Sequence, residues 1–200
     1  MKVPFMRGMK ITLVALVLTA SAPALAHTLV SPGPTAKIAK STMSAVPDSE
    51  WNRLRERGGK NVEVWTVDGD GLNKLMFFGG VPSGKTIVRE EDKRDKPLPT
   101  VSATMLLTDV PTLLEQTYRA QFNVNRMSVD KQEATELGGH KAIRFAYSFV
   151  RQDDEVERRG EAVATLAGGR LFMVLFEAPS LYYFDRDVDR YRRLVSTVKF

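Results

Sequence analysis

Residues 140–179 read HKAIRFAYSFVRQDDEVERRGEAVATLAGGRLFMVLFEAP, and this stretch decides the fold. Large side chains occupy every second position of its first part, with small or polar residues between them: Ile143, Phe145, Tyr147 and Phe149. A period of two predicts a strand with one apolar face. Residues 171–176 (LFMVLF) are continuously apolar, which predicts a strand that is covered on both faces.

A pair of glycines, Gly168 and Gly169, separates the last two apolar runs of this stretch. Both central residues of a primed turn need a positive φ angle, so the pair predicts a tight hairpin. We therefore expect three adjacent antiparallel strands at the centre of a sheet.

Further strands are predicted before this stretch. Residues 61–67 alternate valines with polar residues, and residues 72–78 follow after the turn sequence DGDG, so the two segments indicate a hairpin. Residues 125–136 form another strand, which leads into a second glycine pair. Residues 81–99 are polar and end in KPLP, and we expect most of them to form a loop, with a short strand at 86–88.

Three helices are predicted as well. The first covers residues 48–57, with Asp48 or Ser49 as its cap and two glycines after its end. The second covers residues 109–122 and has a proline in its first turn, where the missing N–H costs nothing. The third begins near Tyr182, with aspartates before arginines, an order that suits the helix dipole. Its buried face is marked by Val188, Tyr191 and Val195, and residues 197–200 are predicted as a final short strand.

Strands and helices are segregated along the chain, which predicts an α+β fold: an antiparallel sheet flanked by two or three helices. This element order, together with the run EAPSLYYFDRDVDRYRRLV at residues 177–195, resembles the bacterial branch of the Mog1/PsbP-like family of small secreted domains. The resemblance covers residues 48–200 and includes no catalytic signature. Since several members of that superfamily are binding or assembly modules, it implies such a role here and transfers no functional residue.

The first 26 residues have the pattern of a signal peptide. Three basic residues precede the apolar run at 11–20, and Ala24-Leu25-Ala26 has the small-x-small pattern of a cleavage site. The apolar run is shorter than the ~20 residues that a membrane span needs. We therefore expect cleavage before His27, a flexible tail at 27–47, a single domain at 48–200, and a periplasmic or secreted protein with no stable membrane span.

Charge and cysteine content narrow the function classes. The net charge of the whole chain is +5, and the signal segment carries three Lys/Arg and no acidic residue, which leaves +2 after cleavage. This small excess, and export itself, argue against nucleic acid as a ligand. With no cysteine in the chain, the protein must be held together by its core instead of by disulfides.

One segment matches a nucleotide-binding pattern. Residues 79–86 read GGVPSGKT and satisfy G-x-x-x-x-G-K-[ST], with Gly79 first and Thr86 last. The residues after Thr86 lack the apolar stripe that a crossover helix needs to pack on a parallel sheet. The sequence thus favours a chance match.

Metal and hydrolase signals are weaker. The run at 68–73 starts like a calcium loop but has Leu72 and Asn73 where the pattern requires an oxygen ligand and glycine, so a hairpin turn is favoured. His27, as the mature N-terminal residue, could bind copper together with His140, but no third protein ligand is evident. A Ser–His hydrolase would also have to use His140, with a serine that the sequence does not identify. The acidic residues at 153–155 indicate a solvated hairpin tip.

Two functional hypotheses remain. The first is an exported, non-catalytic binding or assembly module, which uses a sheet face or the groove beside the C-terminal helix and binds an unknown protein of the cell envelope. The second is a hydrolase-type enzyme with a site built from loops. Neither hypothesis assigns a catalytic, cofactor-binding or metal-binding residue, and no cofactor is expected.

Overall fold

The computed structural model describes residues 27–55, 58–152 and 154–200. The predicted signal peptide at 1–26 lies outside the described residues and stays a prediction. Among the helices of the described ranges, none has both the length and the apolar character needed to cross a bilayer.

In the described part of the chain, eight strands form one antiparallel sheet, in the order β1-β2-β3-β4-β8-β7-β6-β5. Two α-helices and two short 3₁₀ helices of the same described ranges accompany the sheet, so the predicted α+β fold is confirmed. The elements are β1 (Thr28–Val30), η1 (Ile38–Lys40), β2 (Trp51–Arg53), β3 (Val62–Thr66), β4 (Lys74–Pro82), η2 (Leu107–Asp109), α1 (Val110–Gln121), β5 (Val124–Leu137), β6 (His140–Arg151), β7 (Asp154–Ala167), β8 (Arg170–Pro179) and α2 (Tyr183–Val195).

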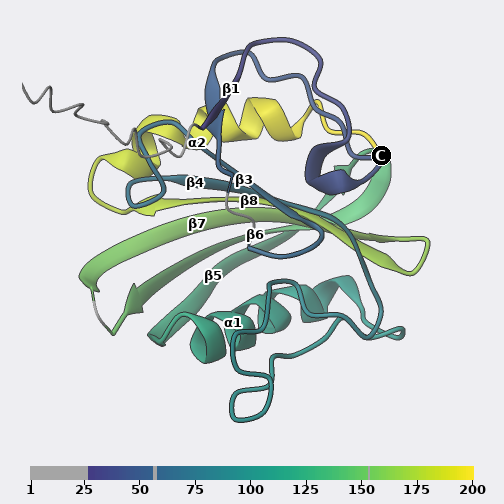
Figure 1. Ribbon diagram of the computed structural model, residues 1–200, viewed down its shortest axis with the longest axis vertical. Coiled ribbons are helices and arrows are strands. Elements are labelled where there is room, and N and C mark those ends of the chain that lie inside the picture. Colours follow the sequence, from purple (N-terminus) through teal and green to yellow (C-terminus); the bar gives the residue numbers. More distant parts are fainter. Residues whose placement is uncertain (1–26, 56–57, 153) are drawn as a thin grey trace, which may run out of the picture.

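The sheet is the middle layer of three (Figure 1). Helix α1 and the long loop before it lie on one face, and α2 lies on the other together with the N-terminal segment. Each face has its own apolar core. The α1 face buries Phe145, Tyr147 and Leu175, whereas the α2 face buries Trp65, Phe176 and Tyr191.

The central strands agree with the predictions. Strands β6, β7 and β8 are adjacent, and the alternating large residues of β6 all face the α1 core. Successive residues of β8 enter opposite cores, Leu175 on one side and Phe176 on the other, so both faces of that strand are covered. Gly168 and Gly169 have φ angles of 57° and 69°, which confirms the primed hairpin between β7 and β8.

The segment at 27–47 differs from the flexible tail that was expected. Strand β1 pairs with β2 at the edge of the sheet, and the side chains of Ile38, Ala39 and Met43 are fully buried on the α2 face. The Ala39 N–H donates to the buried Glu63 carboxylate at 3.0 Å. A segment without hydrophobic periodicity can still be ordered when a few of its side chains fill holes in a core built from later parts of the chain. A search for periodicity does not detect such isolated buried residues.

The helix expected at 48–57 is wrong for residues 48–55, and residues 56–57 lie outside the described residues. Residues 51–53 form strand β2, which pairs with β1 and β3 and buries Trp51 in the α2-side core. Pairing on both sides and burial of an indole override the local helical spacing, since tertiary context outweighs propensity in short segments. The strand predicted at 197–200 is reduced to an isolated bridge between Ser44 and Lys199.

Candidate functional site

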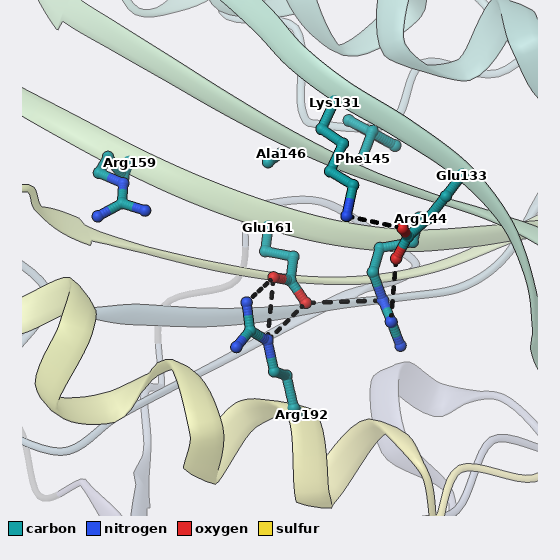
Figure 2. A pocket seen from close by; sticks show the side chains of 8 residues that line it. All are labelled: Lys131, Glu133, Arg144, Phe145, Ala146, Arg159, Glu161 and Arg192. Carbon is teal, nitrogen blue, oxygen red and sulfur yellow. Dashed lines mark hydrogen bonds and ion pairs between the residues drawn. The ribbon is translucent and has the colours of Figure 1, made fainter.

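An open groove lies beside helix α2. The helix packs on β8 and β7, and beyond it part of the same face of β5 and β6 is left open. Alternation along β6 puts Arg144 and Ala146 on this face, where both line the groove. The groove has a volume of about 490 Å³ and is lined by Lys131, Glu133, Arg144, Phe145, Ala146, Arg159, Glu161 and Arg192 (Figure 2).

A buried carboxylate, that of Glu161 on β7, organises the groove. Its side chain is only 6% exposed. Two N–H groups of Arg192 on α2 donate to this carboxylate: Nη2 lies 2.6 Å from Oε2, and Nε lies 3.1 Å from the same oxygen. Hydrogen bonding to Glu161 raises the pKa of Arg192 above its ordinary value. Because two N–H groups of the Arg192 guanidinium bind the same carboxylate, the guanidinium keeps a fixed orientation.

A second guanidinium, that of Arg144 on β6, lies between two carboxylates. Its Nη1 donates to Glu133 Oε1 at 3.3 Å, and its Nε lies 3.7 Å from Glu161 Oε1. This Nε is buried and makes no hydrogen bond within the described residues. Lys131 completes the row by pairing with Glu133 at 2.9 Å, and this hydrogen bond lowers the pKa of the Glu133 carboxyl.

The lining carries more positive than negative charge. Its cations are Lys131, Arg144, Arg159 and Arg192, and its carboxylates are Glu133 and Glu161. Asp185 and Asp189 pair with Arg159 and Arg192 from the rim, but both are strongly exposed. Exposed ion pairs are worth little, so an anionic ligand can replace these two aspartates at low cost.

On the opposite face, a buried carboxyl group lies among tyrosines. Tyr118 of α1 donates from its hydroxyl to Glu177 Oε2 at 2.6 Å. The Tyr147 ring lies over Gly160 of the neighbouring strand β7, and Gly160 pairs with Glu177 of β8. Desolvation raises the pKa of both tyrosines well above the ordinary value. This cluster is enclosed in the core and belongs to the packing of α1 on the sheet.

The phosphate-loop match does not have the fold of a phosphate loop. Its first four residues continue strand β4, and Thr86 bridges to Thr100 instead of starting a helix. The Thr86 hydroxyl donates to the Val88 carbonyl oxygen, so it is occupied within its own turn. Lys85 lines a separate hollow of about 510 Å³ together with Lys60 and Arg89.

The other predicted candidates are dispersed. Asp68 pairs with Arg186 and Asn73 in a turn, as the hairpin interpretation expects. The His140 ring stacks on Phe200 with centroids 5.2 Å apart, and His27 precedes β1, which is separated from β6 by five strands in the sheet. No group of three or more His, Cys, Asp or Glu side chains within the described ranges is arranged to hold a metal ion.

Sequence reasoning named the groove beside the last helix but did not identify its residues. The missed signal is in residues 140–167: Arg144 interrupts a run of small and apolar residues, and Glu161 directly precedes the buried run AVAT. A charged residue within a strand that is otherwise buried needs a partner. The partner Arg192 is on another element, so its identity could not be derived from the local pattern.

Comparisons with known proteins support the fold. The chain is similar to the solution structure of cyanobacterial PsbP (CyanoP) from Synechocystis sp. PCC 6803, with a TM-score of 0.50 and 16% identity over 92% of this chain and 97% of that one. At this identity the likeness shows the fold alone, and the PsbP-like fold implied by the sequence resemblance is confirmed.

Two further structures show weaker likeness. One is a crystal structure from Bacteroides thetaiotaomicron VPI-5482, with a TM-score of 0.49 and 9% identity over 85% of this chain and 48% of that one. The other is LpqN, involved in cell envelope biogenesis of Mycobacterium tuberculosis, with a TM-score of 0.32 and 13% identity over 90% of this chain and 86% of that one. No family model matches the sequence, and the search of curated proteins gave no match.

Proposed function

We propose that this protein is an exported, non-catalytic binding module of the cell envelope, and that the groove beside α2 receives an acidic segment of a protein partner. The observation that carries the proposal is the pair of guanidinium groups, Arg144 and Arg192, that the buried Glu161 carboxylate orients in an open groove. Export is supported by the signal pattern at residues 1–26.

The geometry suits carboxylate recognition. Glu161 holds Arg192 in place before any ligand arrives, and Arg144 keeps a buried Nε without a hydrogen-bond acceptor. Side chains that are already ordered lose little entropy on binding, so more of the interaction energy remains as affinity. An acidic side chain of the partner would pair with these guanidinium groups and displace the exposed rim aspartates.

The test is a titration of the mature protein with hexaglutamate peptide, followed by NMR. We expect the largest shift changes at Arg144, Arg192 and neighbouring amides, and we expect Arg144→Gln to raise the Kd at least tenfold, which is about 1.4 kcal/mol. Binding should weaken with salt, because its driving force is electrostatic.

Arg126→Gln is the matched control for this experiment. Arg126 lies on the neighbouring strand β5, is exposed, and does not line the groove. An equal loss of affinity in both variants would show that only net charge matters and would contradict the proposed site. Shift changes located away from the groove would contradict it as well.

Export makes a separate prediction about processing. The signal peptide should be removed after Ala26, so the intact mass of the protein purified from its own cells should correspond to residues 27–200. Mass spectrometry of periplasmic and culture fractions checks this. Recovery of the uncleaved chain in the cytoplasm would disprove export and leave the groove proposal to be judged by the titration.

A further inference from the structure

A second hollow of the molecule has only positive charge in its lining. It has a volume of about 510 Å³ and lies between the turn before β3 and the segment that follows β4. Lys60, Lys85 and Arg89 line it, and of the described residues no carboxylate does. Within the same ranges, none of these three side chains makes an ion pair or a hydrogen bond. We call the cavity that these three cations line the basic hollow.

The groove beside α2 differs from the basic hollow in this respect. There, Lys131 pairs with Glu133 at 2.9 Å, and the other cations of that lining have carboxylate partners as well. Glu90 follows Arg89 along the chain, but its carboxylate accepts the Leu98 N–H at 3.1 Å and does not line the basic hollow. The charge of the basic hollow is therefore not balanced by the protein's own acidic residues there.

The size and the wall of the basic hollow concentrate the field of its cations. A sphere of its volume is about 10 Å across, which is about one Debye length at 0.1 M salt, so the cations act on one another and on the same ligand. Ile87 and Val88 also line the cavity and are only 1% and 4% exposed, so part of the wall is apolar core. A cleft with charge of one sign and a wall of low dielectric raises the local concentration of counter-ions.

Backbone hydrogen bonds hold the segments that carry the three cations. The Arg89 N–H donates to the Gly58 carbonyl oxygen, which ties the segment after β4 to the turn that contains Lys60. The Val101 N–H donates to the Lys85 carbonyl oxygen at 2.9 Å. The cations therefore stay at one cavity although they repel one another, and this repulsion destabilises the fold. Proteins retain such local conflicts mainly at functional sites.

We propose that the basic hollow is a binding site for a phosphate-bearing anion, which Lys60, Lys85 and Arg89 hold. A phosphate group carries up to about two negative charges at neutral pH in a compact shape, and this suits three cations without a carboxylate. A guanidinium matches the geometry of phosphate oxygens, and a lysine ammonium binds phosphate as a point charge.

The site requires neither a nucleotide nor Mg²⁺. It uses the charge of Lys85 at the side of a cavity, since the segment lacks the helix of a phosphate loop. The basic hollow shares no lining residue with the groove beside α2, so it is an addition to the proposed function and does not depend on it.

The test is isothermal titration calorimetry of the purified protein with sodium diphosphate, without divalent metal ions. We expect one saturable site, and we expect Lys85→Gln and Arg89→Gln each to raise the Kd at least tenfold. Lys93→Gln and Arg94→Gln are the matched controls. They remove the same charges from the exposed loop that follows, outside the lining, and should change the Kd less than about twofold.

Thermal unfolding separates loss of binding from loss of folding. Because the three cations repel one another, Lys85→Gln and Arg89→Gln should melt no lower than the unsubstituted protein. Diphosphate at ten times its Kd should raise the Tm of the unsubstituted protein by about 3–5 °C, and at the same concentration it should raise that of Lys85→Gln by only about 1 °C.

Vesicles distinguish two sources of the phosphate group. Binding of diphosphate without binding to phosphatidylglycerol vesicles assigns a soluble phosphate compound to the site. Binding to these vesicles that Lys85→Gln abolishes and Lys93→Gln does not assigns a phospholipid headgroup instead. Either result supports a phosphate site in the basic hollow.

Four results would overturn the proposal. The first is the absence of saturable diphosphate binding, and the second is an equal loss of affinity in Lys85→Gln and Lys93→Gln, which would mean that only net charge matters. The third is binding that Arg144→Gln weakens as much as Lys85→Gln does, since this would place the anion in the groove. The last is tighter binding of citrate than of diphosphate, or affinity that appears only for ATP with Mg²⁺.

Discussion

At the scale of single residues, the absence of a side chain at Gly160 allows the Tyr147 ring to lie over strand β7. A Cβ atom at position 160 would stand 2.1 Å from Tyr147 Cζ and 2.5 Å from its hydroxyl oxygen, far closer than atoms can approach. Because Tyr147 is buried, the ring has no free space to occupy instead. We expect Gly160→Ala to lower the free energy of unfolding by about 3 kcal/mol, at the upper end of the overpacking range. Urea unfolding measures this.

The control for this prediction is Gly71→Ala. A Cβ atom at position 71 would meet no heavy atom within 4 Å, and the residue lies in an exposed turn, so its replacement should change stability by less than about 0.5 kcal/mol. In a Tyr147→Leu background, the cost of Gly160→Ala should shrink because the clashing ring is gone. A cost that stays the same in that background would show that the glycine is needed for a reason other than the ring.

At the scale of elements, sequence reasoning succeeded where a pattern is repeated within one segment. Strands β5, β6 and β8 and helix α1 have such patterns, and the structure confirms them within one to three residues. Strand β7 begins at Asp154, seven residues before the apolar run EAVATLA that predicts it, so part of the expected charged turn is strand. Sequence reasoning failed at β2 and in the segment at 27–47, where order depends on single residues such as Trp51 and Ile38 filling holes in a core built from later parts of the chain. The same limit applies to the site, since Arg144, Glu161 and Arg192 come from three elements and only folding brings them together.

At the scale of the whole molecule, three buried tyrosines make the free energy of unfolding fall in alkaline solution. Tyr118, Tyr147 and Tyr191 have pKa values raised well above 10 by desolvation. The folded state therefore keeps three protons that the unfolded chain loses above about pH 10. Their contribution to stability is fully present below pH 10 and is lost as the pH rises from there towards the folded-state pKa values.

The expected slope follows from this proton count. Each tyrosine that stays protonated only in the folded state lowers the free energy of unfolding by about 1.4 kcal/mol for each pH unit, so the three together give a slope of about 4 kcal/mol per unit above pH 10. Tyr191→Phe should reduce this slope by about one third, because the hydroxyl that donates to the Val174 carbonyl oxygen is removed along with its proton. Urea unfolding at several values between pH 9 and 11.5, with each protein normalised to its own stability at pH 8, measures both slopes. If the two slopes are equal, the loss of stability in alkali comes from charges elsewhere in the chain, and the role of the buried phenols is refuted.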